Sequence, residues 1–157
     1  MARKVDIGLT TEVRTRVCGR LERVVADLTV LAQKLHAFHW LVRGEEFPMF
    51  HALFGDQYDA VSGTIDTVAE RCRQLGGYPP HTLKKCVALS GIKEFEADSA
   101  DELGMVEMAL LDHEACARYL RESIKSIEGI DCVTANMMQE WCAAHEKAAW
   151  FLRSCLA

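Results

Sequence analysis

The sequence predicts an all-α protein: a four-helix bundle with a short extra helix in the long crossover between helices two and three. Apolar residues recur at steps of three and four along four long segments, which is the spacing of one face of a helix. The 157 residues include only three prolines and ten glycines, so long helices can run without interruption. Half of the residues are hydrophobic, which is enough for one core without disulfides or a structural metal.

The first helix is expected at roughly 11–42. Thr10 or Thr11 supplies the N-cap, and Glu12 is favourable in the first turn. Gly44 is expected to end the helix. Its inward stripe consists of Val13, Val17, Leu21, Val24, Leu28, Leu31, Leu35 and Phe38.

The second helix opens near Pro48, because the N–H that proline lacks has no partner in a first turn. Gly76-Gly77-Tyr78-Pro79-Pro80 stops it. Residues 81–98 form a connection too long for a simple turn, and 82–89 is expected to be a short helix within it. The stripe of the second helix consists of Phe50, Leu53, Phe54, Tyr58, Val61, Ile65, Val68, Cys72 and Leu75.

The third helix is predicted from a capping box at Ser99-Ala-Asp-Glu102 to about 127, with Leu103, Val106, Leu110, Ala117, Leu120 and Ile124 inward. The fourth runs over about 133–155, with Val133, Met137, Trp141, Ala144, Ala148 and Phe151 inward. Trp150 is also assigned to the core. Two short links and one long crossover describe a ferritin-like bundle. Residues 1–9 are expected to be a short flexible segment, and 10–157 the single domain.

Composition excludes several classes of protein. No two of the seven cysteines are spaced as CxxC, so zinc-ribbon and thioredoxin sites are excluded and reduced, mostly buried thiols are expected. No apolar run reaches 18 residues and no secretory leader opens the chain, so we expect no membrane span and a cytoplasmic location. The net charge of −5 disfavours binding of nucleic acid and is compatible with attracting cations.

Four side chains in the first two helices could bind a metal: His39, His51, Asp66 and Glu70. Asp66 and Glu70 are four residues apart, so both carboxylates face one side of the second helix. His51 lies 15 residues before Asp66, or about 22 Å along a straight helix. Either these residues are unrelated, or a second chain packs its second helix antiparallel and brings its histidines to these carboxylates. A two-fold axis would form that site twice.

A di-iron site inside one bundle is the alternative. It needs a Glu-x-x-His pair from each of two helices. The residue three positions before each of the six histidines is never glutamate. This kind of site is therefore not expected, and His36, His81, His113 and His145 are interpreted as structural.

The segment from His39-Trp40 through Gly44, Phe47 and His51 to Ile65-Asp66-Thr-Val-Ala-Glu70-Arg71 resembles Dps, the "DNA-binding protein from starved cells" branch of the ferritins. Leu75-Gly-Gly-Tyr-Pro and His145-Glu-Lys-Ala-Ala-Trp-Phe-Leu-Arg153 are also similar to that family. The resemblance runs over nearly the whole chain from Ile7.

The resemblance implies a hollow homododecamer with ferroxidase sites at its two-fold interfaces, His39 and His51 from one subunit and Asp66 and Glu70 from the other. Such proteins oxidise Fe(II), preferably with hydrogen peroxide, and store ferric mineral, which protects the cell and its DNA from oxidative damage. Trp40 would lie near the site, as packing or as an electron donor. Asp131 and Glu140 match acidic positions that line an iron-entry pore.

One position departs from the family. Gly55 stands where Asp or Glu usually follows the second histidine by one turn, so the centre is expected to be di-iron or mono-iron, with a weaker second position near His51. Asp56 or Asp59 could substitute, and Gly55→Asp should restore a carboxylate. Two alternatives stay open: a DNA-compacting structural protein, and a shell with an impaired ferroxidase site. Residues 1–9 carry only Arg3 and Lys4, offset by Asp6, and the chain ends just after the fourth helix. DNA binding is therefore expected to be weak or absent.

Overall fold

The computed structural model describes residues 5–157, and no β-strand occurs in that range. Its elements are α1 (Thr11–Leu41), α2 (Phe47–Gln74), α3 (Leu83–Leu89), α4 (Glu102–Ile127) and α5 (Cys132–Cys155). The all-α prediction, including the short helix in the crossover, is confirmed. Residues 1–4 of the predicted flexible segment lie outside the described range, and the domain boundary at residue 10 stays a prediction.

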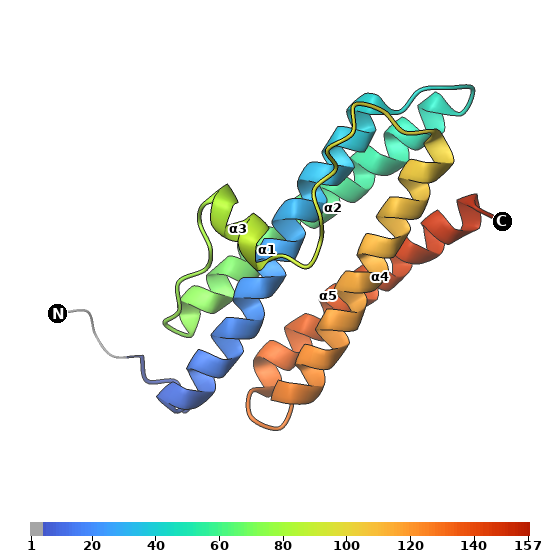
Figure 1. Ribbon diagram of the computed structural model, residues 1–157. Coiled ribbons are helices and arrows are strands. Elements are labelled where there is room, and N and C mark those ends of the chain that lie inside the picture. The colour runs from blue at the N-terminus through green and yellow to red at the C-terminus, as the bar shows by residue number, and fades with distance from the viewer. Residues whose placement is uncertain (1–4) are drawn as a thin grey trace.

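The bundle consists of two antiparallel hairpins, α1 with α2 and α4 with α5 (Figure 1). After α2 the chain forms α3 beside α1, and then runs along the bundle to the end where α1 turns into α2. There α4 begins. The two hairpin links therefore lie at opposite ends of the molecule (Figure 1). Residues 43–49, in the α1–α2 link and the first turn of α2, are exposed.

One continuous core joins the hairpins. Its fully buried side chains of largest volume include Leu21, Leu28, Leu31, Leu35 and Phe38 of α1, Phe54 of α2, Met105 and Leu120 of α4, and Met138 and Leu152 of α5. Burial of a leucine-sized side chain contributes roughly 1.5–3 kcal/mol. The predicted stripe of α1 is therefore mostly correct: of its eight residues, only Val13 in the first turn is half-buried.

The link between α1 and α2 sets the geometry of the candidate site. Thr10 caps the N-terminus of α1 by accepting a hydrogen bond from the Val13 backbone N–H at 3.3 Å. Gly44, predicted to end the helix, lies in the link with φ +133°, a conformation that L side chains rarely adopt. Pro48 lies in the first turn of α2, as predicted. A short link of this kind holds the end of α1 against the start of α2.

The capping box predicted at Ser99 is wrong. Asp101 is the N-cap of α4, and its carboxylate accepts a hydrogen bond from the Gly104 backbone N–H at 2.7 Å. Asp is at least as good an N-cap as Ser, and its charge also interacts favourably with the helix dipole. The helix consequently starts at Glu102, two residues later than a Ser99 cap requires.

The inward stripes predicted for α4 and α5 are partly wrong. Leu103, Val133 and Phe151 are exposed, as is Trp150, at 58%. The buried face of α5 instead consists of Thr134, Ala135, Met138, Trp141, Cys142, His145, Ala149 and Leu152. Histidine, threonine and cysteine on that face weaken its apolar signal, so the prediction selected a stripe rotated toward the surface.

Asp27 in the middle of α1 holds the crossover in place. Its buried carboxylate accepts hydrogen bonds from Ser90 Oγ at 2.8 Å, the Gly91 backbone N–H at 2.7 Å and Arg23 Nε at 2.9 Å. Three donors compensate the desolvation of this charge.

Within residues 5–157 no helix combines the length and apolar character needed to cross a bilayer.

Candidate metal centre

Two imidazoles face each other across the α1–α2 hairpin. His39 lies in the last turn of α1 and His51 near the start of α2, and both side chains are half-buried. Their rings are stacked, with centroids 3.7 Å apart and planes inclined by 22°. The sequence singles out both residues, and the fold brings them into direct contact.

Reciprocal hydrogen bonds fix both rings. His39 Nδ1 lies 2.7 Å from the backbone oxygen of His51, and His51 Nδ1 lies 2.7 Å from the backbone oxygen of His39. A carbonyl oxygen can only accept, so Nδ1 of each ring carries the proton and donates it. In the neutral rings Nε2 then keeps a free lone pair, and this arrangement is the usual one for histidines that bind metals.

The stacking also limits how the two rings can share metal ions. An imidazole lone pair lies in the plane of its ring, and two rings stacked with centroids 3.7 Å apart and planes inclined by only 22° cannot both direct a lone pair at one ion. Each ring is therefore suited to its own ion, in two neighbouring positions. Paired metal ions in two-metal enzyme sites lie about 3.5–4 Å apart, which is close to the separation of the rings.

Gly55 lies directly beneath the ring of His39. A Cβ built at this position would be 3.0 Å from His39 Nδ1 and 3.1 Å from Cε1. Contacts this short would force the ring to move by a few tenths of an ångström. Glycine at position 55 thus removes a carboxylate and also gives the Nδ1–Cε1 edge of the His39 ring the room to approach α2.

The two predicted carboxylates lie elsewhere on α2. Asp66 and Glu70 are exposed near the C-terminal end of this uninterrupted helix, far from His51. Among residues 5–157, no three His, Cys, Asp or Glu side chains gather closely enough to hold a metal ion. One protomer brings the two histidines together and presents the two carboxylates at another point on its surface.

The remaining predicted site residues fall into different environments. Trp40 is 60% exposed and packs on His36, with ring centroids 4.1 Å apart. Asp56, proposed as a substitute ligand, lines a cavity of about 350 Å³ between α2 and α5. One helical step of about 100° turns it away from the face that carries Gly55. As a ligand, Asp56 stays a prediction that the geometry of a single protomer does not favour.

Asp131, predicted as a pore residue, is buried and bonded within its own chain. It is the N-cap of α5, accepts hydrogen bonds from the Thr134 backbone and hydroxyl, and pairs with Arg71 Nη2 at 3.2 Å. Burial raises the pKa of Asp131, but the Thr134 hydrogen bonds and the Arg71 guanidinium outweigh it and leave the pKa lowered. Glu140 is exposed on α5. Their pore role stays a prediction.

His113 and His145 form a second histidine pair, at the floor of the α2–α5 cavity. Their Nδ1 atoms lie 2.8 Å apart in one hydrogen bond, and both rings are buried. Burial lowers the pKa of His113 to about 3 and that of His145 to about 4, so both are uncharged at neutral pH. Their prediction as structural residues agrees with this environment.

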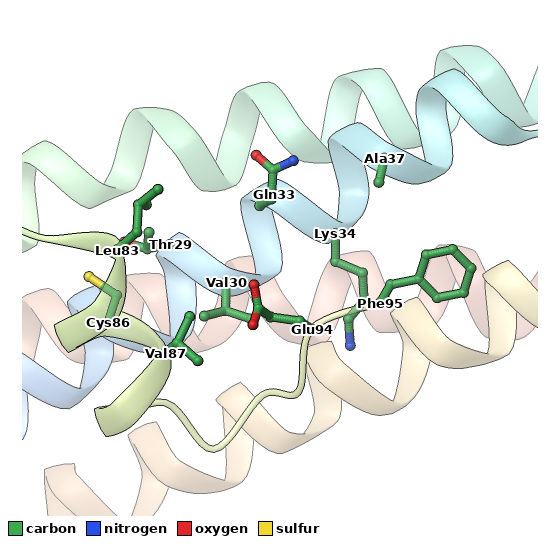
Figure 2. A pocket seen from close by; sticks show the side chains of 10 residues that line it. All are labelled: Thr29, Val30, Gln33, Lys34, Ala37, Leu83, Cys86, Val87, Glu94 and Phe95. Atoms are coloured by element: carbon green, nitrogen blue, oxygen red, sulfur yellow. The ribbon is translucent and has the colours of Figure 1, made fainter. Parts of the chain in front are cut away.

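A further cavity of about 250 Å³ separates α1 from α3 and the crossover (Figure 2). Lys34 of α1 and Glu94 of the crossover are among the residues that line it (Figure 2). The Lys34 ammonium is already paired with Asp112 at 2.6 Å, and neither candidate histidine lines the cavity. The histidine pair at the α1–α2 turn is therefore the better candidate for metal binding.

Comparison with known proteins identifies the family of the chain. A model of the ferritin-like domain matches residues 18–157. The chain is 34% identical over 150 residues to the DNA protection during starvation protein of Brevibacillus brevis, covering 94% of this chain and 99% of that protein. The chain belongs to the Dps family. The prediction from the sequence motifs is confirmed.

Other members of the family show the same extent of similarity. DNA protection during starvation protein 2 of Bacillus anthracis is 35% identical over 137 residues, 87% of this chain and 93% of that protein. The crystal structure of a Dps protein from Bacillus brevis superposes with a TM-score of 0.89 at 34% identity, covering 95% of this chain and all of the other. The likeness therefore includes fold and sequence over almost the full length.

Two residues make contacts that the sequence pattern did not predict. Arg71 appeared only as part of a motif, yet its buried guanidinium joins the end of α2 to the start of α5 through Thr134 and Asp131. His36, interpreted as structural, stacks on Tyr58 and lies beside His39. The spacing of three between His36 and His39 on one helix was the available signal.

Proposed function

We propose that this chain is the subunit of an iron-storing shell that oxidises Fe(II), preferably with hydrogen peroxide, and retains the ferric product. The observation that supports this most is the histidine pair, whose Nδ1 atoms are held by backbone carbonyls while Nε2 stays available. Carboxylate and imidazole together suit Fe(II), and the family supports iron rather than other divalent ions.

The active centre would form between two protomers. A two-fold axis that packs α2 against its symmetry mate in antiparallel fashion carries Asp66 and Glu70 of one chain to His39 and His51 of the other. Both carboxylates are exposed and the histidines are half-buried at the surface of the hairpin, so both halves are available for such contact. The family resemblance implies twelve chains in the complete shell, located in the cytoplasm.

The reaction consumes two Fe(II) ions and one hydrogen peroxide and yields two Fe(III) ions and two hydroxide ions. The imidazoles bind the substrate ions, and the carboxylates compensate the additional positive charge that develops when each ion is oxidised. Removing Fe(II) and peroxide together limits formation of hydroxyl radicals. This chemistry is consistent with relatives named for DNA protection during starvation.

Mixed assemblies test the site between subunits. His39→Ala and Asp66→Ala should each abolish most peroxide-driven Fe(II) oxidation, as should Glu70→Ala, while far-UV circular dichroism stays unchanged. When His39→Ala and Asp66→Ala chains are co-assembled in equal amounts, about one quarter of the sites should regain all ligands. A site within one chain predicts no recovery. His81→Ala, an exposed change outside the site, is the control.

A protein that oxidises iron as a monomer would contradict the site as described. If wild type oxidises no iron and binds no divalent metal, the alternative of a shell with an impaired centre becomes the better one. Gly55 is the observation that favours this alternative, because no side chain at position 55 can supply a ligand.

A further inference from the structure

His36 lies one turn before His39 on α1, in the same row of rings as the candidate centre. Its ring stacks on Tyr58 of α2, with centroids 3.9 Å apart and planes inclined by 12°. Within residues 5–157, the histidines whose ring nitrogens make hydrogen bonds are His39, His51, His113 and His145. Both nitrogens of the half-buried His36 ring are therefore open to another partner.

The rings of His36 and His39 are farther apart and more inclined than the stacked rings of His39 and His51. The centroids of His36 and His39 lie 6.0 Å apart, and the planes are inclined by 38°. Two imidazoles that bind one ion at metal–nitrogen distances of about 2.0–2.1 Å have centroids roughly 5–6 Å apart. His36 and His39 can share an ion in a way that His39 and His51 cannot.

The position of Gly55 indicates what the His36–His39 pair could contribute to the centre. Because α1 and α2 are antiparallel, His39 lies over Gly55, and His36 lies over the next turn of α2, at Tyr58. A carboxylate at position 55 would start beside the His39 ring, between the turn of α2 that carries His51 and the turn that carries Tyr58. An additional imidazole in that region offers the centre a donor that residue 55 does not supply.

We propose that His36 is a third imidazole ligand of this centre, which with His39 forms a His-x-x-His pair on α1 that holds one divalent cation. The inference rests on the proposed function, because the remaining ligands are Asp66 and Glu70 of a second copy of the chain. The result is one strong position with two imidazoles and two carboxylates, and a weaker one at His51. A donor set rich in nitrogen suits Fe(II), Co(II) and Zn(II) better than Mg(II) or Ca(II).

A purely structural role for His36 is the competing interpretation, since stacking on Tyr58 requires only a flat ring. His36→Phe separates the two, because phenylalanine keeps the stack and removes both nitrogens. The matched control is His81→Phe, an exposed histidine in the connection between α2 and α3. The probe is Co(II), which peroxide-free buffer leaves in one oxidation state and whose visible spectrum reports its ligands.

Assembled wild-type protein should bind Co(II) tightly at one position per subunit. In His36→Phe the Kd of that position should rise about tenfold or more, since even groups that only orient a metal ligand contribute this much. Its visible spectrum should also change, while His81→Phe matches wild type. If His36→Phe does not fold by circular dichroism, His36→Gln replaces it, with the same two readouts.

An unchanged Kd and spectrum in the folded His36 variant would overturn the inference and leave the proposed function intact. If wild type binds no Co(II), or if Asp66→Ala binds as tightly as wild type, the proposed function fails instead. The two failures are thus distinguished by which variant departs from expectation.

Discussion

The ring of His39 lies against the backbone of Gly55, where a Cβ would stand 3.0 Å from Nδ1. From the sequence, Gly55 is a missing ligand, and Gly55→Asp is expected simply to restore one. In the structure the same substitution adds a carboxylate and also crowds the ring of His39, a candidate ligand. Its outcome therefore depends on both effects.

Gly55→Ala and Gly55→Asp together separate these effects. Relative to glycine, alanine favours the helix by about 0.8–1 kcal/mol and aspartate by only about 0.3 kcal/mol. Both substitutions should weaken the binding of the ion held by His39, because Cβ presses on its ring. Only Gly55→Asp should bind a second ion near His51. Titration with Co(II) gives stoichiometry and Kd for wild type and both variants. A Gly55→Asp protein with one ion and wild-type affinity would show that residue 55 faces no metal position.

The two candidate histidines were predictable at the scale of single residues, whereas the hydrogen bonds of their Nδ1 atoms were not. Motif spacing singles out His39 and His51, because these residues recur at fixed separations in a known family. The carbonyl partners of their Nδ1 atoms depend on how the end of α1 meets the start of α2. The residue pattern of a single segment cannot predict how the ends of two helices meet.

At the scale of helices, the apolar stripe predicts α1 well and α5 poorly. Leucine and valine dominate the buried face of α1, so its period is plain. On α5 the buried face includes Thr134, Cys142 and His145, each satisfied by a partner on another helix or at the cap. Polar residues that are buried because of tertiary partners cannot be recognised from hydropathy alone.

The link between α2 and α5 through Arg71 should be important for stability. Asp131→Ala removes the N-cap of α5 and leaves the buried Arg71 guanidinium without its carboxylate, which should cost about 3 kcal/mol or more. Urea unfolding measures this loss. Glu140→Ala, an exposed change on the same helix, should stay within about 0.5 kcal/mol of wild type. Equal effects of the two substitutions would contradict the assignment of Asp131 as a structural residue.

The His113–His145 pair should make the bundle sensitive to acid. Burial lowers both pKa values, to about 3 and about 4, from about 6.5 in the unfolded chain. Below pH about 6.5 the unfolded state binds protons that the folded state does not, so the free energy of unfolding falls as pH falls. The slope contributed by each histidine is at most about 1.4 kcal/mol per pH unit.

Urea unfolding between pH 7 and pH about 4.5 tests this expectation. A double variant, His113→Gln with His145→Gln, retains hydrogen-bonding groups and removes the titration, so its stability should depend less steeply on pH. Carboxylates titrate alike in both proteins and cancel in the comparison. Identical slopes would mean that the pair is already protonated or hydrated in the native state.

At the scale of the whole molecule, charge governs which partners can bind. The chain carries 18 Lys and Arg residues against 23 Asp and Glu residues. An assembled shell multiplies this excess of negative charge, and duplex DNA is itself an anion. Because both the protein and DNA are negatively charged, a strong complex between them is not expected.

Gel-shift assays at two salt concentrations test the interaction with DNA. Binding should be weak at about 20 mM salt and absent at about 150 mM, because few phosphate contacts can form and salt competes for each. Iron-loaded and iron-free shells should behave alike, since the mineral is enclosed. A retarded band that persists at the higher salt would favour the DNA-compacting alternative.

The carbonyl of His39 lies in the last turn of α1, where no N–H of the same helix lies four residues ahead. The Nδ1–H of His51 takes that place at 2.7 Å, so a metal-binding side chain also closes the end of a helix. A cation that fixes the His51 ring would then suppress fraying of α1. Amide hydrogen exchange of the link at 42–46 and of the α1 terminus should slow when Zn(II) is added, and His51→Ala should exchange fast with or without the ion. Amide hydrogen exchange at the end of α1 would thus report metal occupancy without any redox chemistry.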